Sequence, residues 1–220
     1  MIAKFPSKYR PTRSLLNRLG VYEREVQFYQ KLASELPLNA PRPYFTVWNN
    51  QSQESLLLLE DLSCLRVVDQ LIGCAQEDAQ LAVNDLARFH ANFWNSAGLA
   101  DMSWAPRWDM GAEIFQTTYP ILWRRLLQNM AESLPPAMSY LGEIIGPHIT
   151  AIKRRLARPP ATLVHGDFRL DNMFFNSQTR RISVVDWQGV RLGRGTYDLA
   201  YFTATSLTSN MRRRWQDKLI

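Results

Sequence analysis

Residues 164–189 read VHGDFRLDNMFFNSQTRRISVVDWQG, and this stretch decides the fold. Apolar residues lead into His165, and a second apolar run occupies residues 173–175. Residues 176–178 predict a turn, and residues 181–185 predict the returning strand of a β-hairpin. That hairpin would bring three polar side chains to one end of a short sheet: Asp167, Asn172 and Asp186.

These three side chains have the types and the spacing that are typical of protein-kinase-like phosphotransferases. Phosphoryl transfer needs a carboxylate that accepts the proton of the attacking hydroxyl, and Asp167 is placed for this role. It also needs hard oxygen ligands for Mg²⁺, which Asn172 and Asp186 can supply. Taken singly, Asp167 is better explained as a turn residue and Asp186 as a solvated strand end. Their combination between two apolar strands favours the catalytic interpretation.

The N-terminal segment predicts a strand followed by a helix. Residues 1–5 form a short apolar strand that carries Lys4, and residues 21–36 have the apolar spacing of a helix. In the kinase arrangement a glutamate of this helix holds the strand lysine by an ion pair. Glu25 is the preferred glutamate and Glu23 the alternative. The competing interpretation is an exposed lysine beside an acidic helix face.

Two more strands are predicted at residues 44–48 and 55–59, joined by a turn. The second ends in Glu60, Asp61 and Leu62. In a kinase-like fold this segment is the hinge, whose main-chain N–H and C=O groups bind the adenine edge. Glu60 and Leu62 are therefore predicted nucleotide contacts through the main chain, and a plain acidic strand end is the alternative.

Three further helices are predicted at residues 77–95, 112–130 and 137–156, with a loop at 98–111. His90 lies in the apolar stripe of the first of them. A packed, hydrogen-bonded core histidine is expected there rather than a metal ligand.

After the hairpin, residues 192–195 predict a flexible turn, and Thr196 is predicted to cap the next helix. Asp198 is expected to cap backbone or brace the catalytic loop rather than to react. Few acidic and many aromatic residues lie between 98 and 158, which favours an apolar, steroid-like alcohol as acceptor over an aminoglycoside or choline. Core packing is the alternative explanation of these aromatic residues: Trp104, Trp108, Phe115, Tyr119 and Trp123.

The 220 residues are 46% hydrophobic and 21% charged, a composition typical of globular domains, with a formal net charge of +6. No apolar run has the length of a membrane span, and the N-terminus lacks the apolar core of a signal peptide. Cys64 and Cys74 make neither a metal pattern nor a disulfide framework, which favours the cytoplasm. The basic residues are scattered, so neither nucleic acid nor a membrane is an expected partner.

Seven segments together resemble the aminoglycoside phosphotransferase and choline kinase superfamily, and most closely its ecdysteroid-kinase-like branch. They are, in the family's order, AKF (3–5), YEREVQFY (22–29), LLLLEDL (56–62), LARFHANFW (86–94), HGDFRLDN (165–172), VVDWQ (184–188) and YDLAYF (197–202). The pairing of the HGD and DWQ segments is the most specific part of this resemblance.

The resemblance implies an α+β, protein-kinase-like, two-lobed fold. Residues 1–62 would form an incomplete N-lobe, and residues 63–220 a mainly helical C-lobe with the catalytic hairpin. The implied reaction moves the γ-phosphoryl group of ATP, with Mg²⁺, to a hydroxyl of a small molecule. Lys4 would contact the α- and β-phosphates, braced by Glu25, and His165 would brace the catalytic loop.

The two ends of the chain depart from the family pattern. The segment before Lys4 has no room for the two strands and the phosphate-covering loop that normally precede this lysine. After Tyr201 the family continues through more helices than this chain holds. We therefore expect a fragment or a mis-started reading frame. Two functions remain: an active small-molecule kinase, which the filled catalytic positions favour, or a catalytically weak or inactive nucleotide-binding remnant, which the missing loop favours.

Overall fold

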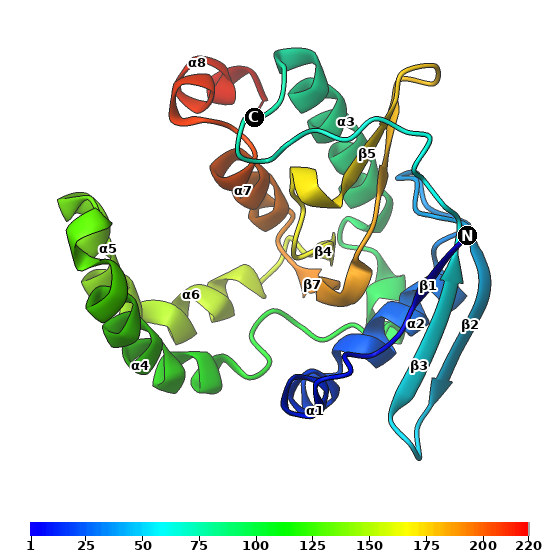
Figure 1. Ribbon diagram of the computed structural model, residues 1–220, viewed down its shortest axis with the longest axis horizontal. Helices are drawn as coiled ribbons and strands as arrows, with labels where there is room; N and C mark the ends of the chain where they lie inside the picture. Colours follow the sequence, from blue (N-terminus) through cyan, green and yellow to red (C-terminus); the bar gives the residue numbers. More distant parts are fainter. Residues whose placement is uncertain (220) are drawn as a thin grey trace.

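The computed structural model describes residues 1–219, and it begins with a three-stranded antiparallel sheet in the order β1-β3-β2 (Figure 1). The three strands lie where the sequence predicts strands: β1 (Ile2–Lys4), β2 (Pro43–Asn49) and β3 (Glu54–Leu59). Lys4 is in register with Leu57. Leu57 and Leu59 are buried, and α2 (Val21–Lys31) packs against this sheet. A short helix, α1 (Arg10–Arg18), precedes α2.

Helix α2 begins after Gly20, whose φ of +64° lies in the left-handed region that glycine tolerates best. It ends at Lys31 rather than at Leu36, so the predicted helix was too long. The residue before a proline is driven out of the α region by the proline ring. Pro37 therefore prevents helical continuation, and the chain turns over residues 32–35.

The core lies between α3 (Gln76–Phe93), the helix predicted at residues 77–95, and the hairpin. The buried positions of α3 repeat at intervals of three and four residues, which puts them on one helix face: Ala79, Ala82, Leu86, Phe89 and Phe93. Trp187, directly after the hairpin, stacks on Phe28 of α2 with 3.9 Å between the ring centroids. This contact joins the sheet-bearing part of the chain to the helical part.

The predicted hairpin forms between β5 (Met173–Asn176) and β6 (Arg181–Val184). The predicted flexible turn at 192–195 was wrong, because β7 (Arg191–Gly193) pairs with β4 (Thr162–Val164). A Cβ on Gly193 would stand 3.1 Å from the Leu156 carbonyl oxygen and 3.3 Å from Trp108 Cβ. This glycine therefore allows a close approach rather than flexibility.

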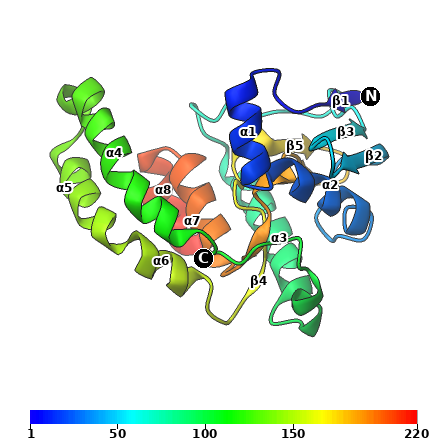
Figure 2. The ribbon, with the colours of Figure 1, turned by 90° about the horizontal axis from the view of Figure 1, so that it is seen from below.

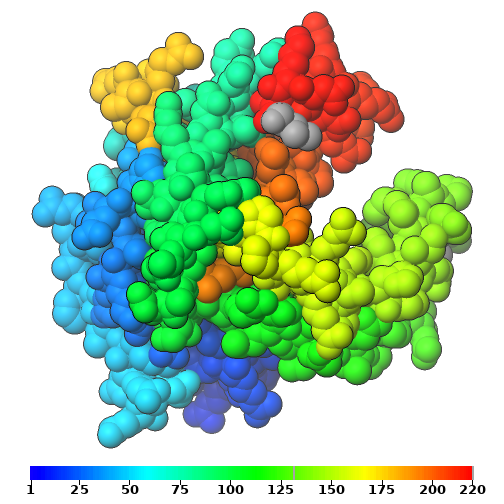
Figure 3. All heavy atoms as spheres, turned by 180° about the vertical axis from the view of Figure 1, so that it is seen from behind, coloured from blue at the N-terminus to red at the C-terminus, as the bar shows by residue number. Residues whose placement is uncertain are grey.

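Helices α4 (Ala112–Met130), α5 (Pro136–Ile145) and α6 (Ile149–Leu156) form an extended arm, residues 112–156 (Figures 1 and 2). The predicted single helix at 137–156 was wrong, because a short 3-10 turn at Gly146–His148 divides it. Pro147 lacks the N–H that a continuous helix needs. Seen from behind as spheres, the arm is separated from the C-terminal helix by an open notch (Figure 3).

The chain continues through α7 (Thr196–Thr205) and α8 (Ser209–Leu219). Gly195 occupies the N-cap of α7 without a side-chain cap, so the predicted capping by Thr196 was wrong. A Cβ at position 195 would stand 2.5 Å from His90 Nδ1, which explains the glycine there. Among the residues that the structure describes, no helix combines the length and apolar character needed to cross a bilayer.

Candidate active site

Asp198 braces the loop that carries Asp167. This fully buried carboxylate accepts the main-chain N–H groups of His165 at 2.7 Å and Gly166 at 2.9 Å. His90 Nε2 of α3 lies 3.0 Å from it. The structure thus gives Asp198 the bracing role expected of it and places His90 as a packed, hydrogen-bonded core residue.

Glycine is the only residue type that fits at position 166. Its φ is +84°, and a Cβ there would stand 2.5 Å from the Gly189 carbonyl oxygen. The loops before β5 and after β6 therefore touch through backbone atoms. This contact brings the residue after Gly166, Asp167, close to the segment that begins at Asp186.

His165 positions Asp167 and does not itself face a ligand. The ring is fully buried, its Nδ1 accepts the Asp167 N–H at 3.2 Å, and its Nε2 lies 3.0 Å from the Val185 carbonyl. Burial lowers the pKa of His165, so the ring is neutral with Nε2–H as donor. His165 therefore ties the catalytic loop to the end of β6, the bracing role that the resemblance implies.

Asp167 and Asn172 meet directly. The Asn172 amide nitrogen donates to Asp167 Oδ2 at 2.9 Å and to the Asp167 carbonyl at 2.8 Å. Arg169 Nε lies 3.2 Å from Asp167 Oδ1. Because its amide nitrogen is used in this way, Asn172 keeps its amide oxygen for another ligand.

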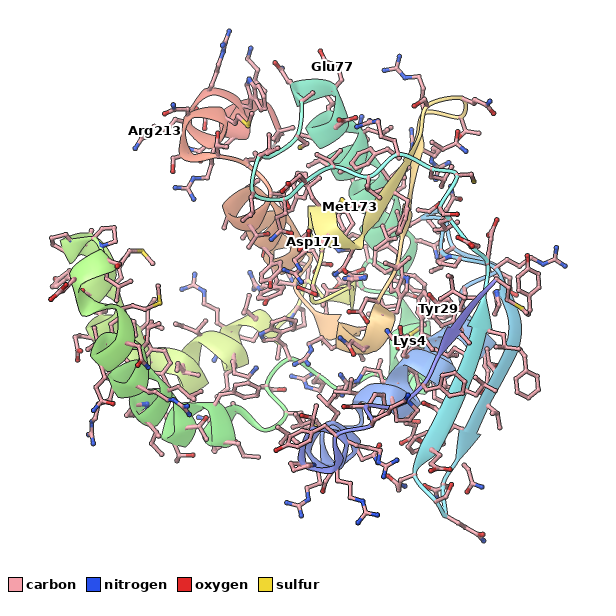
Figure 4. All side chains as sticks on the ribbon, in the orientation of Figure 1. Lys4, Tyr29, Glu77, Asp171, Met173 and Arg213 are labelled. Carbon is pink, nitrogen blue, oxygen red and sulfur yellow. The ribbon has the colours of Figure 1, made fainter. Side chains whose placement is uncertain are left out.

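Lys4 joins the N-terminal sheet to the other side of the site. Its Nζ lies 2.8 Å from Glu25 Oε1 and 2.6 Å from Asp186 Oδ1, and Figure 4 shows Lys4 pointing from β1 into the molecule. Burial lowers the pKa of Lys4, but Glu25 and Asp186 raise it by more, so the net shift is upward. Glu25, and not the alternative Glu23, is the partner of Lys4.

The donor set fits a magnesium ion that is shared with phosphate. Val185 N–H donates to the Asn172 carbonyl at 3.0 Å, so Asn172 lies beside the residue that precedes Asp186. Residues 1–219 contain no group of three or more His, Cys, Asp or Glu side chains that could enclose a metal. Mg²⁺ is commonly held by one or two protein oxygens together with substrate phosphates and water. One carboxylate and one amide oxygen match that pattern.

A cavity of about 430 Å³ lies between β1, the end of β3 and the hairpin. Lys4, Glu25 and Asp186 lie at its polar side, and its remaining walls are largely apolar. Glu60 and Leu62, the predicted nucleotide contacts, are among its lining residues. The Glu60 N–H donates to the Arg42 carbonyl, and the Leu62 carbonyl accepts the Leu65 N–H, both at 2.9 Å.

The aromatic residues that were predicted to line an acceptor pocket or to pack in the core lie in different places. Tyr119 donates to the Gly142 carbonyl at 2.9 Å, and Trp123 donates to Glu143 at 2.6 Å. Both therefore pack between α4 and α5, as the core-packing alternative expects. Trp108 lies elsewhere, 3.9 Å from the ring centroid of Tyr197 in the first turn of α7.

Sequence reasoning missed several buried charges. Asp85 of α3 is fully buried and accepts from the Ile182 N–H at 3.0 Å, while Arg181 Nε lies 2.8 Å from it. Asp85 thereby fixes the hairpin to α3. The sequence did contain a sign of this role: Asp85 is a carboxylate within the apolar stripe of that helix, and burying an unpaired charge there would cost too much free energy. Arg24 and Arg191 also escaped notice, because Gln188, which covers Arg24, and Trp108, which covers Arg191, lie far from them in the sequence.

The comparisons with solved structures agree with this fold. A choline kinase from Streptococcus pneumoniae superimposes with a TM-score of 0.58 at 16% identity, over 99% of this chain and 66% of that one. The GDP and kanamycin complex of an aminoglycoside phosphotransferase gives 0.57 at 14% identity, over 93% and 70% of the two chains. At these identities the likeness shows the fold, which is that of the kinase-like phosphotransferases.

Among curated proteins, acyl-CoA dehydrogenase family member 11 from Gallus gallus is 29% identical over 138 residues, or 60% of this chain. The human protein of that name is 34% identical over 82 residues. The matches cover 16% and 10% of those proteins, so this chain corresponds to a small part of each. The model of the ecdysteroid kinase-like family matches residues 1–220, and the chain belongs to that family.

Proposed function

We propose that this chain transfers the γ-phosphoryl group of ATP to a hydroxyl of a small molecule. The observation that carries the proposal is the convergence of Lys4, Glu25 and Asp186 with the Asp167–Asn172 pair around one hairpin end. Family membership and the fold support the same reaction class. The division into a smaller lobe, residues 1–62, and a larger lobe, residues 63–220, belongs to this proposal.

The purine would lie in the 430 Å³ cavity, against its apolar walls. Since the chain itself uses the Glu60 N–H and the Leu62 carbonyl, the Glu60 carbonyl and the Leu62 N–H are the groups left for the purine edge. Lys4 would leave Asp186 for the phosphates and keep Glu25. Burial raises the pKa of Glu25, and the Lys4 charge opposes that shift.

Asn172 and Asp186 would hold Mg²⁺, which supplies charge neutralisation of the triphosphate when bound. The Asp167 carboxylate would accept the proton of the acceptor hydroxyl as that oxygen attacks phosphorus. Asn172 orients this carboxylate by the 2.9 Å hydrogen bond to Oδ2. Arg169 Nε contacts the other carboxylate oxygen, Oδ1, at 3.2 Å. His165 and Asp198 hold the loop in place.

The rival proposal is a nucleotide-binding protein with weak or no turnover, and Asp167→Asn separates the two. This change keeps the size of the side chain and removes the base. We expect ATP with Mg²⁺ to raise the melting temperature of both wild type and variant, while phosphate transfer from labelled ATP to a panel of alcohols falls about 100-fold or more in the variant.

Asp171→Asn is the matched control. Asp171 lies in the same loop, is half exposed, and contacts Arg169 at 3.4 Å. We expect its transfer rate to stay within about threefold of wild type, because it touches neither the proposed metal site nor the acceptor. Transfer that survives Asp167→Asn would contradict the proposed base. A wild-type chain that binds ATP and transfers nothing would favour the rival.

A further inference from the structure

A second hollow, of about 480 Å³, lies between α1, the beginning of α4 and β7. We call it the arginine groove. Most of its wall is apolar, including Leu15, Ile114, Phe115 and Ile121, and it also contains three arginines: Arg18, Arg24 and Arg191. A groove that combines apolar walls with several like charges needs an explanation, because burying unpaired cations is costly.

Arg24 is the most deeply buried of these charges, with 7% of its surface exposed. One terminal nitrogen donates to the Gln188 carbonyl at 2.9 Å and the other to the Leu19 carbonyl at 2.7 Å. The buried Nε has no hydrogen-bond partner within residues 1–219. Burial and the charge of Arg191 lower the pKa of Arg24 to about 10. Arg24 is therefore satisfied by neutral carbonyls and lacks an anion.

Arg191 is in the same situation. Its Nε donates to the Gly189 carbonyl at 3.1 Å, and its guanidinium lies 4.7 Å from the centre of the Trp108 ring. Within the described part of the chain, neither Arg24 nor Arg191 forms an ion pair with a carboxylate. Burial lowers the pKa of Arg191 as well.

A further cation approaches from the arm. Lys153 Nζ of α6 lies 4.2 Å from the centre of the Phe115 ring and 5.3 Å from that of Trp108. Burial and Arg191 lower the pKa of Lys153 to about 8. The acid whose charge acts on Lys153, Asp109, is already paired with Arg107 at 3.3 Å. Positive charge from Arg191 of β7 and Lys153 of α6 thus gathers at Trp108, and within residues 1–219 neither side chain forms an ion pair with a carboxylate.

We infer that the arginine groove binds a small amphipathic anion, with a carboxylate or phosphate head between Arg24 and Arg191 and an aliphatic body along Phe115 and Ile121. Guanidinium groups match such oxyanions in geometry as well as charge. The anion supplies the negative charge that the groove lacks. This class differs from polycations such as aminoglycosides, which the arginines would repel.

The groove adjoins the catalytic loop. The Gly189 carbonyl that Arg191 binds also contacts Gly166, the neighbour of Asp167. On the other side, the Tyr197 ring is tilted against Trp108 and stacks on Tyr201, and burial together with a hydrogen bond to Asp167 raises the pKa of Tyr201. A bound anion that also carries a hydroxyl group near its head is therefore the acceptor: the hydroxyl oxygen attacks the γ-phosphorus, its proton passes to Asp167 and ADP leaves, a step that rests on the proposed function.

Calorimetric titration without ATP tests the groove directly. The probes are decanoate and decyl phosphate, with decyltrimethylammonium and decanol as the cationic and neutral counterparts. We expect the anions to bind at least tenfold more tightly than both counterparts. The better of the two anions identifies the preferred head. Equal affinity for all four probes, or no binding of either anion, would overturn the inference.

Two variants and a control locate the site. Arg191→Gln should weaken decanoate and decyl phosphate binding about tenfold. Ile121→Glu, at an exposed position of the groove, should weaken it similarly with no loss of a buried contact. Arg212→Gln, on the exposed face of α8, should change it less than twofold. Unchanged binding in both groove variants would refute the site.

A transfer assay keeps the two proposals distinguishable. Anion binding without any phosphate transfer would uphold the groove and end the proposed function. Transfer from labelled ATP to 1,3-decanediol as fast as to 3-hydroxydecanoate, whose hydroxyl lies next to the head group, would uphold the function and overturn the assignment of an anionic acceptor.

Discussion

The Asp198 carboxylate offers the sharpest test of how this site is held together. Asp198→Asn keeps the side chain's shape and removes its charge. In the native protein one carboxylate oxygen accepts both the His165 N–H and His90 Nε2, and the other accepts the Gly166 N–H. An amide has only one oxygen, so its NH₂ group must face one of these donors. Every bond that remains also loses its charge-assisted strength.

The cost can be worked from these contacts. The variant leaves one buried donor unpaired and removes the charge of Asp198, which accepts three hydrogen bonds. Together these changes should lower the free energy of unfolding by about 3–5 kcal/mol. For a chain of this size that lowers the melting temperature by about 10 °C. Asp217→Asn makes the same chemical change at an exposed position of α8 and should leave the melting temperature within about 1 °C.

Calorimetric melting of the two variants and wild type at pH 7.5 is the assay. The transfer rate of Asp198→Asn, measured well below its melting temperature, should fall as well, since the Asp167 loop loses its brace. A melting temperature of Asp198→Asn within 2 °C of wild type would refute the reasoning, because it would mean that the three hydrogen bonds to this buried carboxylate contribute little to stability.

Two further predictions address the same loop. Gly166→Ala should lower the unfolding free energy by more than about 2 kcal/mol and remove most of the transfer rate, because the new Cβ would stand 2.5 Å from the Gly189 carbonyl oxygen at a φ of +84°. Gly98→Ala is the control: the nearest atom to its Cβ would be 3.6 Å away, so urea unfolding and turnover should be nearly unchanged. Burial holds the folded-state pKa of His165 below its ordinary value of 6.5, so the unfolded chain binds the proton first as the pH falls. Stability should therefore fall below pH 6.5, by up to about 1.4 kcal/mol per pH unit, and this contribution should stay constant above it. Urea unfolding between pH 5 and 8 should show that slope in wild type and lose it in His165→Asn, and an identical slope in both proteins would assign the effect elsewhere.

The hairpin was predictable because its signals are local. A turn at 176–178, two apolar runs and polar residues at their ends are enough to bring Asp167, Asn172 and Asp186 into one neighbourhood. The Lys4–Glu25 ion pair followed from the order of strand and helix. Which of the two glutamates faces Lys4 could not be decided locally, since it depends on how α2 is rotated against the sheet.

Glycine was the residue most easily misinterpreted. Local reasoning treats a run such as Leu192-Gly-Arg-Gly195 as flexible, because glycine tolerates many backbone angles. In the fold, Gly193 and Gly195 are there for lack of a side chain: each lies where a Cβ would meet Trp108 or His90. Those neighbours are distant in the sequence, so no single-sequence pattern separates a glycine that bends from one that makes room.

Arginine raises the same problem in terms of charge. A net charge of +6 spread along the chain suggests solvated surfaces, and Arg24 follows Glu23 on what looks like a charged helix face. Yet Arg24 is 7% exposed and bonded to the carbonyls of Leu19 and Gln188. Its environment is created by β7 and the loop after β6, which approach from more than 160 residues away. A buried cation whose partners are all neutral carbonyls still needs an anion, and that need is visible only in the folded chain. It is why the groove points to an anionic acceptor, whereas the sequence alone favoured an apolar alcohol.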